Sequence, residues 1–191
     1  MRVTVISATE KPIDVISRAA GTCYGKDNAS KKRMETCYNS GHLSVFEHAN
    51  VVLRIEGISR ACMAQLTRHR MVSFCVESQR YTKYDLSGED WYVMPPELER
   101  FAGFEKCMEH AAAFYMGAIK AGAKPEDARY VLPEATKTNL VMTCNVRELF
   151  HIFDMRAASS AQWEIRDLAK AMYEACKGIN REWREVMELR A

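Results

Sequence analysis

Hydrophobic and polar positions along this chain follow two periods, and the changes from one to the other predict its strands and helices. Residues 2–8 and 50–56 alternate one by one, as half-buried strands do. Two further strand-like stretches, each containing proline, run over 91–97 and 130–145. Apolar residues three or four apart predict helices over these segments: 12–20, 30–40, 58–66, about 97–121, a short stretch from Pro125, and two stretches that begin at Asn145 and Ser159.

The longest predicted helix, over about 97–121, places its apolar residues on one seam. They occupy positions 101, 104, 108, 111, 115 and 118. A seam of this spacing packs against another helix, and we expect that packing across a subunit interface. No repeat or linker divides the 191 residues, which predicts a single domain over 1–191. Many helices with few short strands predict an α+β, helix-rich domain with a small, mostly antiparallel sheet.

Polar capping residues mark two helix starts near the C-terminus. Glu148 follows Asn145 by three residues, and Gln162 follows Ser159 by three, which is the spacing of a capping pair. Arg156 therefore lies at a junction between two helices, where a side chain can be directed at a ligand.

Composition argues against several classes of protein. The net charge is only +2, too small for a chain that coats nucleic acid by bulk electrostatics. The seven cysteines contain no C-x-x-C pair, which predicts reduced, mostly buried thiols without a disulfide framework or zinc site. The start of the chain is too short and polar for a signal peptide, and the longest apolar run, from Ala111, is far below the ~20 residues of a membrane span. We expect a soluble, cytoplasmic protein without a bound metal.

Positive charge is concentrated in the stretch "RHRMVSFCVESQRY", from Arg68 to Tyr81. If residues 74–81 are extended, Ser78 and Arg80 share a face and can hold one phosphate between a hydroxyl and a guanidinium. The alternatives are a solvated loop with scattered arginines or a patch for nucleic acid. The apolar centre of the stretch favours a semi-enclosed site, and a nucleophilic Ser78 is disfavoured because no base is placed beside it.

Two other stretches carry candidate chemistry. In "GHLSVFEH", His42 and His48 are six residues apart, which is not the spacing of a helical metal pair, and the segment also reads as a helix-to-strand connection capped by Ser44. In "NVRELFHIFDMRAASSAQWE", polar groups surround an apolar helix pair, and His151 taken alone is more typical of a core or interface.

Four motifs in order resemble one family. Arg68-His69-Arg70 followed by seven residues and Ser78 reproduces an R-H-R-x7-S signature, and "GHLSVFEH" is similar to G-H-x-[ST]-x-F-E-H. "ARYVLP" from Ala128 and the block from Asn145 are similar to two further elements of the same family. The resemblance runs from about residue 15 to 177, and it is to the flavin-dependent thymidylate synthases, the ThyX family.

The resemblance implies a ThyX-like fold and reductive methylation of dUMP to dTMP, with methylenetetrahydrofolate, NADPH and FAD, in a homotetramer. It implies a flavin site made by Ser44, Glu47, Arg68, His69, Arg70, Met71, Asn145, Arg147 and His151. It implies a dUMP site made by Gln65, Ser78, Gln79, Arg80, Arg129 and Arg156. Arg156 is expected to stabilise charge at the uracil carbonyl edge, and His42 to lie near the flavin ring and folate; these two are the catalytic candidates.

The chain departs from the family's usual residues at six positions: Cys23, Cys75, Val76, Glu77, His151 and Ser160. Two other functions stay open at this point. A related flavoenzyme could carry out different chemistry, such as hydroxymethylation, on a pyrimidine nucleotide. The less favoured alternative is a nucleic-acid-binding module that uses the arginine cluster.

Overall fold

The computed structural model describes residues 1–88 and 90–190, and these form two compact units. The first unit comprises Met1–Ile55, Leu66–Cys75 and the chain from Val141 onward. The second unit comprises Glu56–Gln65 and Val76–Leu140. The assignment of the whole chain to one domain stays a prediction.

The described chain is helix-rich with one small sheet, which confirms the predicted α+β class. Four strands form an antiparallel sheet in the order β1-β2-β4-β3. The strands are β1 (Arg2–Ala8), β2 (Asn50–Ser59), β3 (Val72–Val76) and β4 (Lys137–Asn145). The α-helices are α1 (Pro12–Thr22), α2 (Lys31–Asn39), α3 (Arg60–Leu66), α4 (Gly103–Lys120), α5 (Pro125–Ala128), α6 (Val146–Arg156), α7 (Trp163–Lys177) and α8 (Arg181–Met187). Short 3-10 helices are η1 (Leu43–His48), η2 (Pro96–Leu98), η3 (Arg129–Val131) and η4 (Glu188–Arg190).

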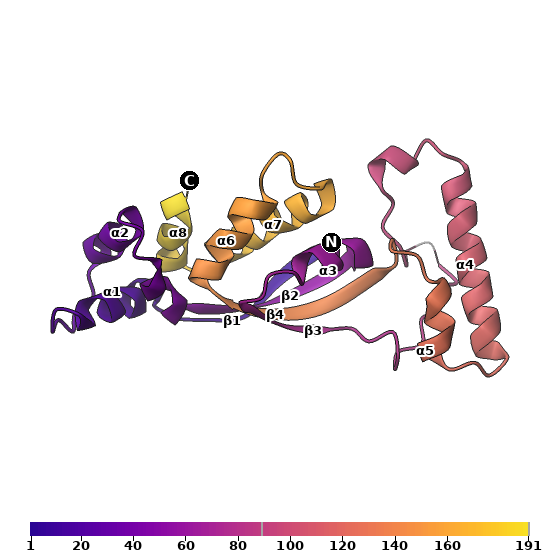
Figure 1. Cartoon of the computed structure of the whole chain (residues 1–191), viewed down its shortest axis with the longest axis horizontal. Helices are drawn as coiled ribbons and strands as arrows, with labels where there is room; N and C mark the ends of the chain where they lie inside the picture. Colours follow the sequence, from indigo (N-terminus) through magenta and orange to yellow (C-terminus); the bar gives the residue numbers. More distant parts are fainter. Residues whose placement is uncertain (89, 191) are drawn as a thin grey trace. The chain divides into compact units, whose positions relative to one another are not determined.

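In the first unit, α6 and α7 lie on one face of the sheet (Figure 1). The alternation predicted for residues 50–56 is confirmed, because Val51, Leu53 and Ile55 are fully buried. Leu149 of α6 and Leu168 of α7 are also fully buried, as helical spacing predicts. Each such side chain contributes about 1.5–3 kcal/mol by leaving water, so this packing fixes α6 against the sheet.

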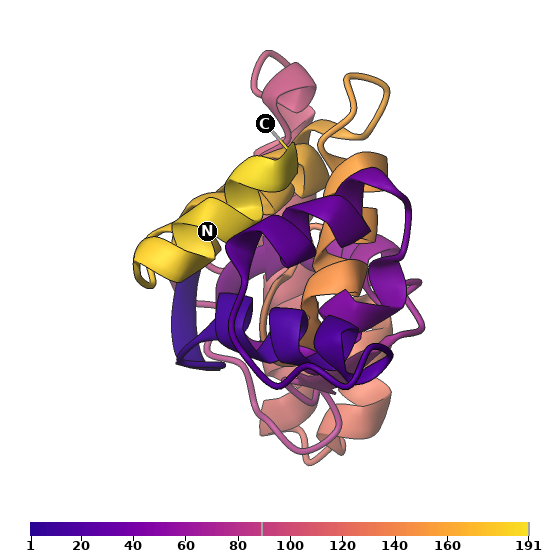
Figure 2. The same ribbon diagram turned by 90° about the vertical axis from the view of Figure 1, so that its left-hand side faces the viewer.

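In the first unit, α8 packs against α1, which lies near the start of the sequence. The helices α1, α2 and α8 are neighbours on one side of this unit (Figure 2). The fully buried Trp183 of α8 donates from Nε1 to the carbonyl of Thr9 at 2.8 Å. The neighbouring carboxylate of Glu182 accepts from the backbone N–H of Ile13 at 2.9 Å. That N–H lies in the first turn of α1 and has no partner within its own helix. The C-terminal helix thus completes the start of α1.

The second unit is built around α4. Tyr115 is fully buried and belongs to one core cluster with Leu86, Ala112 and Ala128. Its hydroxyl accepts a hydrogen bond from the backbone N–H of Tyr84 at 3.2 Å. The prediction that one helix covers about 97–121 is wrong at its start. Pro95 is held extended before Pro96, Pro96–Leu98 form a separate 3-10 turn, and the α-helix begins only at Gly103.

Three further local predictions need correction. β3 ends at Val76, because the Ser78 hydroxyl accepts from the N–H of Arg80 at 3.1 Å and forms a turn, so residues 74–81 are not one extended strand. The cap of α7 is Gln162, not Ser159, since the Gln162 side chain accepts from the N–H groups of Glu164 and Ile165. In the stretch 91–97, Tyr92 makes a single bridge to Thr136 instead of a strand.

All seven cysteines are free thiols, as expected, but most are not buried. Cys62, Cys144 and Cys176 are buried, whereas Cys23, Cys75 and Cys107 are exposed. The spacing of apolar residues in the sequence does not distinguish the buried cysteines from the exposed ones. None of the helices in the described part of the chain has the length and apolar character needed to cross a bilayer.

Candidate functional site

The first unit contains a pocket of about 480 Å³ that gathers many of the predicted flavin residues. Its wall consists of Leu43, Glu47, Met71, Asn145, Arg147, Glu148, Phe150, His151 and Asp154. Five of these nine (Glu47, Met71, Asn145, Arg147 and His151) belong to the predicted flavin set. The structure therefore brings together residues from η1, from the segment before β3 and from the first turns of α6.

Apolar packing holds η1 at the pocket. Phe46 is fully buried, and its ring lies 6.0 Å from that of Tyr38 and 5.8 Å from that of Phe150. With Phe46 anchored, the next residue, Glu47, is directed outward and accepts a hydrogen bond from Arg147 Nη1. Both side chains of this pair are about half exposed, so the pair is weak, and an anionic ligand can compete for Arg147.

The start of α6 positions the opposite wall. The Asn145 side chain accepts from the N–H of Glu148 at 2.9 Å, which confirms the predicted cap. On this helix Leu149 and Ile152 are buried in the core, while Arg147 and His151 are exposed on the pocket side. Helical periodicity thus divides α6 into a face that packs and a face that lines the pocket.

His69 lies buried behind the pocket wall and connects two residues of α6. Its Nδ1 is 3.1 Å from Glu148 Oε1, and its Nε2 accepts from Arg156 Nε at 3.0 Å. The His151 ring packs edge-on at 5.4 Å between centroids. Burial lowers the pKa of His69; Glu148 opposes that shift and the charge of Arg156 adds to it, so the neutral imidazole is favoured.

His69, Glu148 and His151 place potential metal-ligand atoms within 4.8 Å of one another. Sequence spacing does not reveal this group, because Glu148 and His69 are 79 residues apart. The geometry disfavours a cation there: His69 uses both ring nitrogens in hydrogen bonds, and one partner is the positively charged Arg156.

The remaining residues of the predicted flavin site are on the surface of the first unit. Arg68 and Arg70 flank His69 and are exposed, and Met71 is 67% exposed although its side chain is apolar. Ser44 is exposed within η1. His42 is exposed just before η1, and its backbone N–H donates to the carbonyl of Cys37 at 2.9 Å. An exposed apolar side chain next to arginines in the sequence suits a ligand that is both aromatic and anionic.

The predicted dUMP residues other than Arg156 belong to the second unit: Gln65, Ser78, Gln79, Arg80 and Arg129. Two of them meet at Glu126, where Arg80 Nε donates to the carboxylate at 2.6 Å and Arg129 Nε donates to the backbone carbonyl at 3.1 Å. Hydrogen bonding to Arg80 lowers the pKa of Glu126. Gln65 lies on α3, while Ser78 and Gln79 form the turn after β3.

Glu77, one of the departures from the family pattern, has a structural role in the second unit. Its carboxylate accepts from Asn139 Nδ2 at 2.7 Å, and its backbone carbonyl accepts from Arg60 Nη2 at 2.9 Å. These bonds tie the end of β3 to β4 and to α3, so they hold the turn that carries Ser78.

Sequence reasoning missed five residues that line the pocket or hold a candidate arginine: Leu43, Phe150, Asp154, Glu126 and Glu148. Glu148 was read only as a helix-capping partner. Its position in the sequence contains a usable signal. Glu148 precedes His151 by three residues and Ile152 by four, so helical spacing places its carboxylate at the border of the apolar face of α6.

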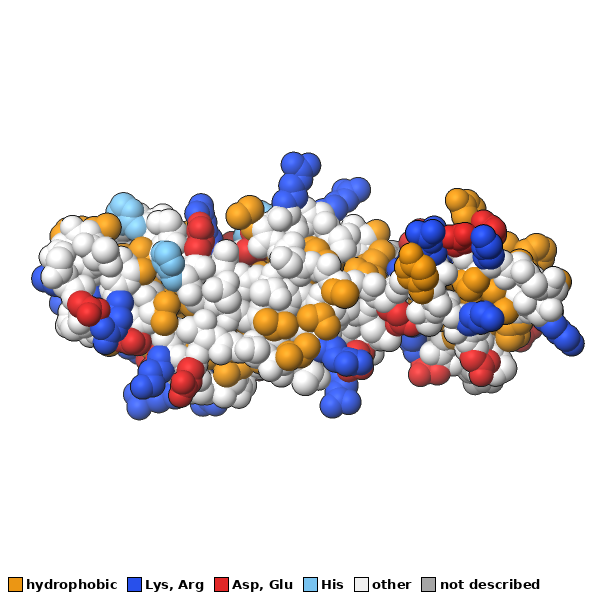
Figure 3. All heavy atoms as spheres, turned by 90° about the horizontal axis from the view of Figure 1, so that it is seen from below, with side chains coloured by type: hydrophobic (Ala, Val, Ile, Leu, Met, Phe, Trp, Pro, Cys, Tyr) orange, Lys and Arg blue, Asp and Glu red, His pale blue; other side chains and the backbone are white. Residues whose placement is uncertain are grey.

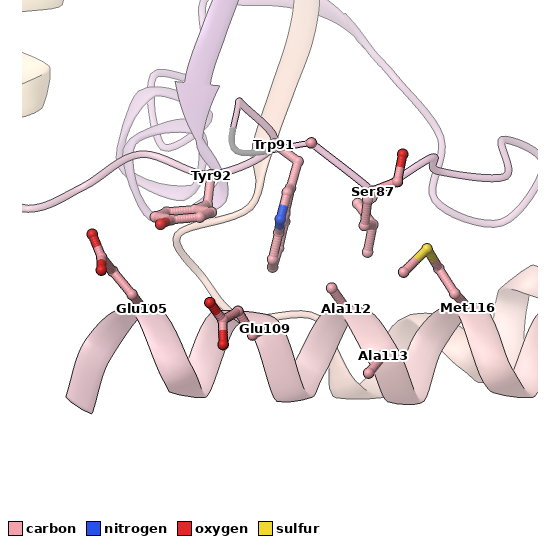
Figure 4. Close-up of a pocket in the computed structure, with 10 residues that line it drawn as sticks. Ser87, Trp91, Tyr92, Glu105, Glu109, Ala112, Ala113 and Met116 are labelled. Atoms are coloured by element: carbon pink, nitrogen blue, oxygen red, sulfur yellow. The ribbon is translucent and has the colours of Figure 1, made fainter. Parts of the chain in front are cut away.

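A second hollow of about 450 Å³ lies in the second unit, where the rings of Trp91 and Tyr92 approach α4 (Figure 4). Glu105 and Glu109 of α4 lie opposite these rings. None of the residues predicted for flavin or nucleotide is among those that line this hollow.

The fold and the first pocket define an α+β protein with a small-molecule pocket lined by both charged and apolar side chains. The family model described as thymidylate synthase complementing protein matches residues 4–180. The chain is 35% identical to the flavin-dependent thymidylate synthase of Haloarcula marismortui, over 91% of this chain and 90% of that protein. It is 36% identical to that of Pyrococcus furiosus, over 91% of this chain and 78% of that protein. This chain belongs to the flavin-dependent thymidylate synthase family.

Solved structures agree with this assignment. The flavin-dependent thymidylate synthase ThyX of Helicobacter pylori, complexed with FAD and dUMP, matches with a TM-score of 0.77 and 28% identity, over 92% of this chain and 93% of that chain. A UMP/dUMP methylase from Streptomyces cacaoi matches with a TM-score of 0.81 and 23% identity, over 98% of this chain and 93% of that chain, which shows a shared fold. The predicted ThyX-like fold is confirmed.

Proposed function

We propose that this chain converts dUMP to dTMP, with methylenetetrahydrofolate as the carbon donor, NADPH as the reductant and FAD as the hydride relay. The observation that carries the proposal is the pocket of the first unit, which unites five residues of the predicted flavin site. Family membership supplies the reaction, and the pocket supplies groups suited to the cofactor.

The residues present fit FAD. Arg68, Arg70 and Arg147 are exposed guanidinium groups that suit a pyrophosphate, and the exposed side chain of Met71 offers apolar surface for an aromatic ring. Bound FAD supplies hydride transfer. The protein's own part is to bind and orient it, with Ser44, Glu47, Asn145 and His151 as further polar contacts.

In the second unit, Arg80 and Arg129 are the proposed ligands of the dUMP phosphate, with Ser78, Gln79 and Gln65 as neighbouring phosphate or ribose contacts. Support comes from the convergence of both arginines on Glu126. The Arg80–Glu126 pair is exposed, so a doubly charged phosphate can replace the carboxylate as the partner of Arg80.

Arg156 is the proposed electrostatic catalyst. Its permanent positive charge would stabilise the negative charge that develops on the uracil carbonyl edge when the ring is activated. His42, exposed at the entrance to η1, is the proposed contact near the flavin ring and folate.

We also propose a homotetramer in the cytoplasm. Large apolar side chains are exposed on the surface, among them Ile6, Phe114 and Tyr130, and Figure 3 shows such side chains mixed with charged ones on one face. Free thiols are typical of the reducing cytoplasm. Light scattering of the flavin-loaded protein tests the tetramer by its mass.

The test of the function is an assay of the purified, flavin-reconstituted protein with dUMP, methylenetetrahydrofolate and NADPH. We expect a yellow protein and dTMP as product; a protein that binds no FAD and forms no dTMP would refute the proposal. The mass of the product distinguishes methylation from hydroxymethylation. A colourless protein whose oligonucleotide binding falls steeply with salt would instead support the nucleic-acid alternative.

A matched pair of variants tests the role of Arg156. Arg156→Ala is expected to reduce turnover far more than it lowers the melting temperature, because a half-buried arginine at the end of a helix adds little to the core. Arg156→Lys keeps the charge and should retain more activity than the alanine variant. Equal losses of stability and activity in Arg156→Ala would contradict this role.

A further inference from the structure

Glu148, His69 and Arg156 form an unbroken line of hydrogen bonds within the first unit. Glu148 is the third residue of α6 and Arg156 the last, so eight residues, or about 12 Å of helix axis, separate them. The imidazole of His69 spans this gap, with contacts of 3.1 Å to the carboxylate and 3.0 Å to the guanidinium. His69 is 5% exposed and Glu148 is 8% exposed, so water competes little for either group.

The direction of one bond fixes the direction of the other. Arginine Nε carries a hydrogen and can only donate, so His69 Nε2 must present its lone pair to Arg156. In a neutral imidazole the single ring proton then lies on Nδ1, which donates to Glu148 Oε1. The guanidinium and the carboxylate thus favour the same tautomer of His69, and the carboxylate does so by accepting the Nδ1 proton.

Loss of that acceptor would act on Arg156 through His69. Without a partner for Nδ1–H, the ring proton can move to Nε2, and two N–H donors would then face each other at the 3.0 Å contact. Arg156 would have to move away. Displacement of a reacting group by about 1 Å can lower a rate about 100-fold.

We propose, on the basis of the proposed function, that Glu148 is a positioning residue: it holds His69 in the Nδ1–H tautomer, and His69 in turn anchors Arg156 for the substrate. This assigns Glu148 a role beyond helix capping, and it explains why a carboxylate is buried against a histidine that is neutral. The His151 ring, edge-on to His69, restricts rotation of the imidazole and so supports the same geometry.

The first measurement is the tautomer of His69 in the wild-type protein, read from the ¹⁵N chemical shifts of its ring nitrogens. Histidine labelling gives five signals to assign, and the spectrum of His69→Asn identifies the one that disappears. We expect protonated Nδ1 and unprotonated Nε2. An Nε2–H tautomer would overturn the inference without any enzyme assay.

The second measurement compares variants that keep or remove the acceptor. Glu148→Met has a similar volume without an acceptor and should shift His69 to the Nε2–H form and lower kcat about 100-fold, with a smaller change in KM for dUMP. Glu148→Gln keeps an acceptor oxygen and should restore the tautomer and most of kcat. Asp167→Ala, which removes an exposed carboxylate on α7, is the control. Melting temperatures of all variants check folding, and Glu148→Ala replaces Glu148→Met if that variant unfolds.

The inference is overturned if the variants without an acceptor keep the Nδ1–H tautomer, or if they shift the tautomer and still turn over like the control. A wild-type protein that makes no dTMP would refute the proposed function. In that case the NMR comparison still decides whether Glu148 controls His69, so the two failures are distinguishable.

Discussion

Asn145 combines two tasks that a pair of substitutions can separate. It caps α6 by accepting the N–H of Glu148 at 2.9 Å, and it lines the pocket of the first unit. Removal of an asparagine cap costs about 1 kcal/mol of unfolding free energy, so Asn145→Ala should lower the melting temperature of the flavin-free protein by about 2–4 °C. Asn145→Ser keeps a capping oxygen and should melt close to the wild type.

Flavin affinity should follow a different order. If the Asn145 amide contacts FAD, both variants lose that hydrogen bond. The dissociation constant for FAD should then be about tenfold larger. Flavin fluorescence during titration measures the affinity, and circular dichroism measures the melting temperature. The serine variant is decisive because it changes affinity without changing the cap.

Asn180 provides the matched control. It caps α8 in the same way, by accepting the N–H of Trp183 at 3.0 Å, and it does not line the pocket. Asn180→Ala should lower the melting temperature at least as much as Asn145→Ala, because the Asn180 amide also donates to the carbonyl of Glu10 at 3.0 Å, and it should leave FAD affinity unchanged. An unchanged melting temperature in Asn145→Ala would refute the capping argument, and wild-type affinity in Asn145→Ser would refute the flavin contact.

Three other predictions concern pH, substrate binding and thiol reactivity. Burial lowers the pKa of His69 below its ordinary 6.5, so the unfolded chain takes up this proton at higher pH than the folded one, and unfolding free energy should fall as pH drops through about 6.5. Denaturant titrations between pH 5 and 8 should show this slope, and it should be smaller in His69→Asn. Glu126→Gln should lower the KM for dUMP, by about fivefold at most, because Arg80 loses its competing partner; a higher KM would contradict this. Maleimide should label the exposed Cys75 in the native protein, whereas Cys176, whose pKa burial raises to about 12, should react only after unfolding, as peptide mass spectrometry can show.

The sequence predicts well those features that depend on residues close to one another along the chain. The cap at Asn145 and the buried faces of β2, α6 and α7 follow from local spacing, and the structure confirms them. Local spacing was misleading where a side chain bonded its own backbone, since the Ser78 turn ends a strand whose alternation continues in the sequence.

Pairings between distant segments lay beyond sequence reasoning. His69 and Glu148 are 79 residues apart, and Arg80 and Glu126 are 46 apart, so no periodicity connects either pair. The family motif indicated the arginines and the histidine, but it did not indicate the carboxylates that hold them. The flavin and nucleotide assignments therefore stay predictions, while the carboxylate contacts are observations.

The closure of α8 over α1 has a consequence for how this protein is made. Trp183 and Glu182 complete the packing and the first turn of α1, yet they follow their partners Thr9 and Ile13 by 174 and 169 residues. A growing chain on the ribosome has made α1 to α7 before α8 is available. The start of the first unit must therefore wait, incompletely packed, until α8 has been made, whereas the second unit is complete about forty residues earlier.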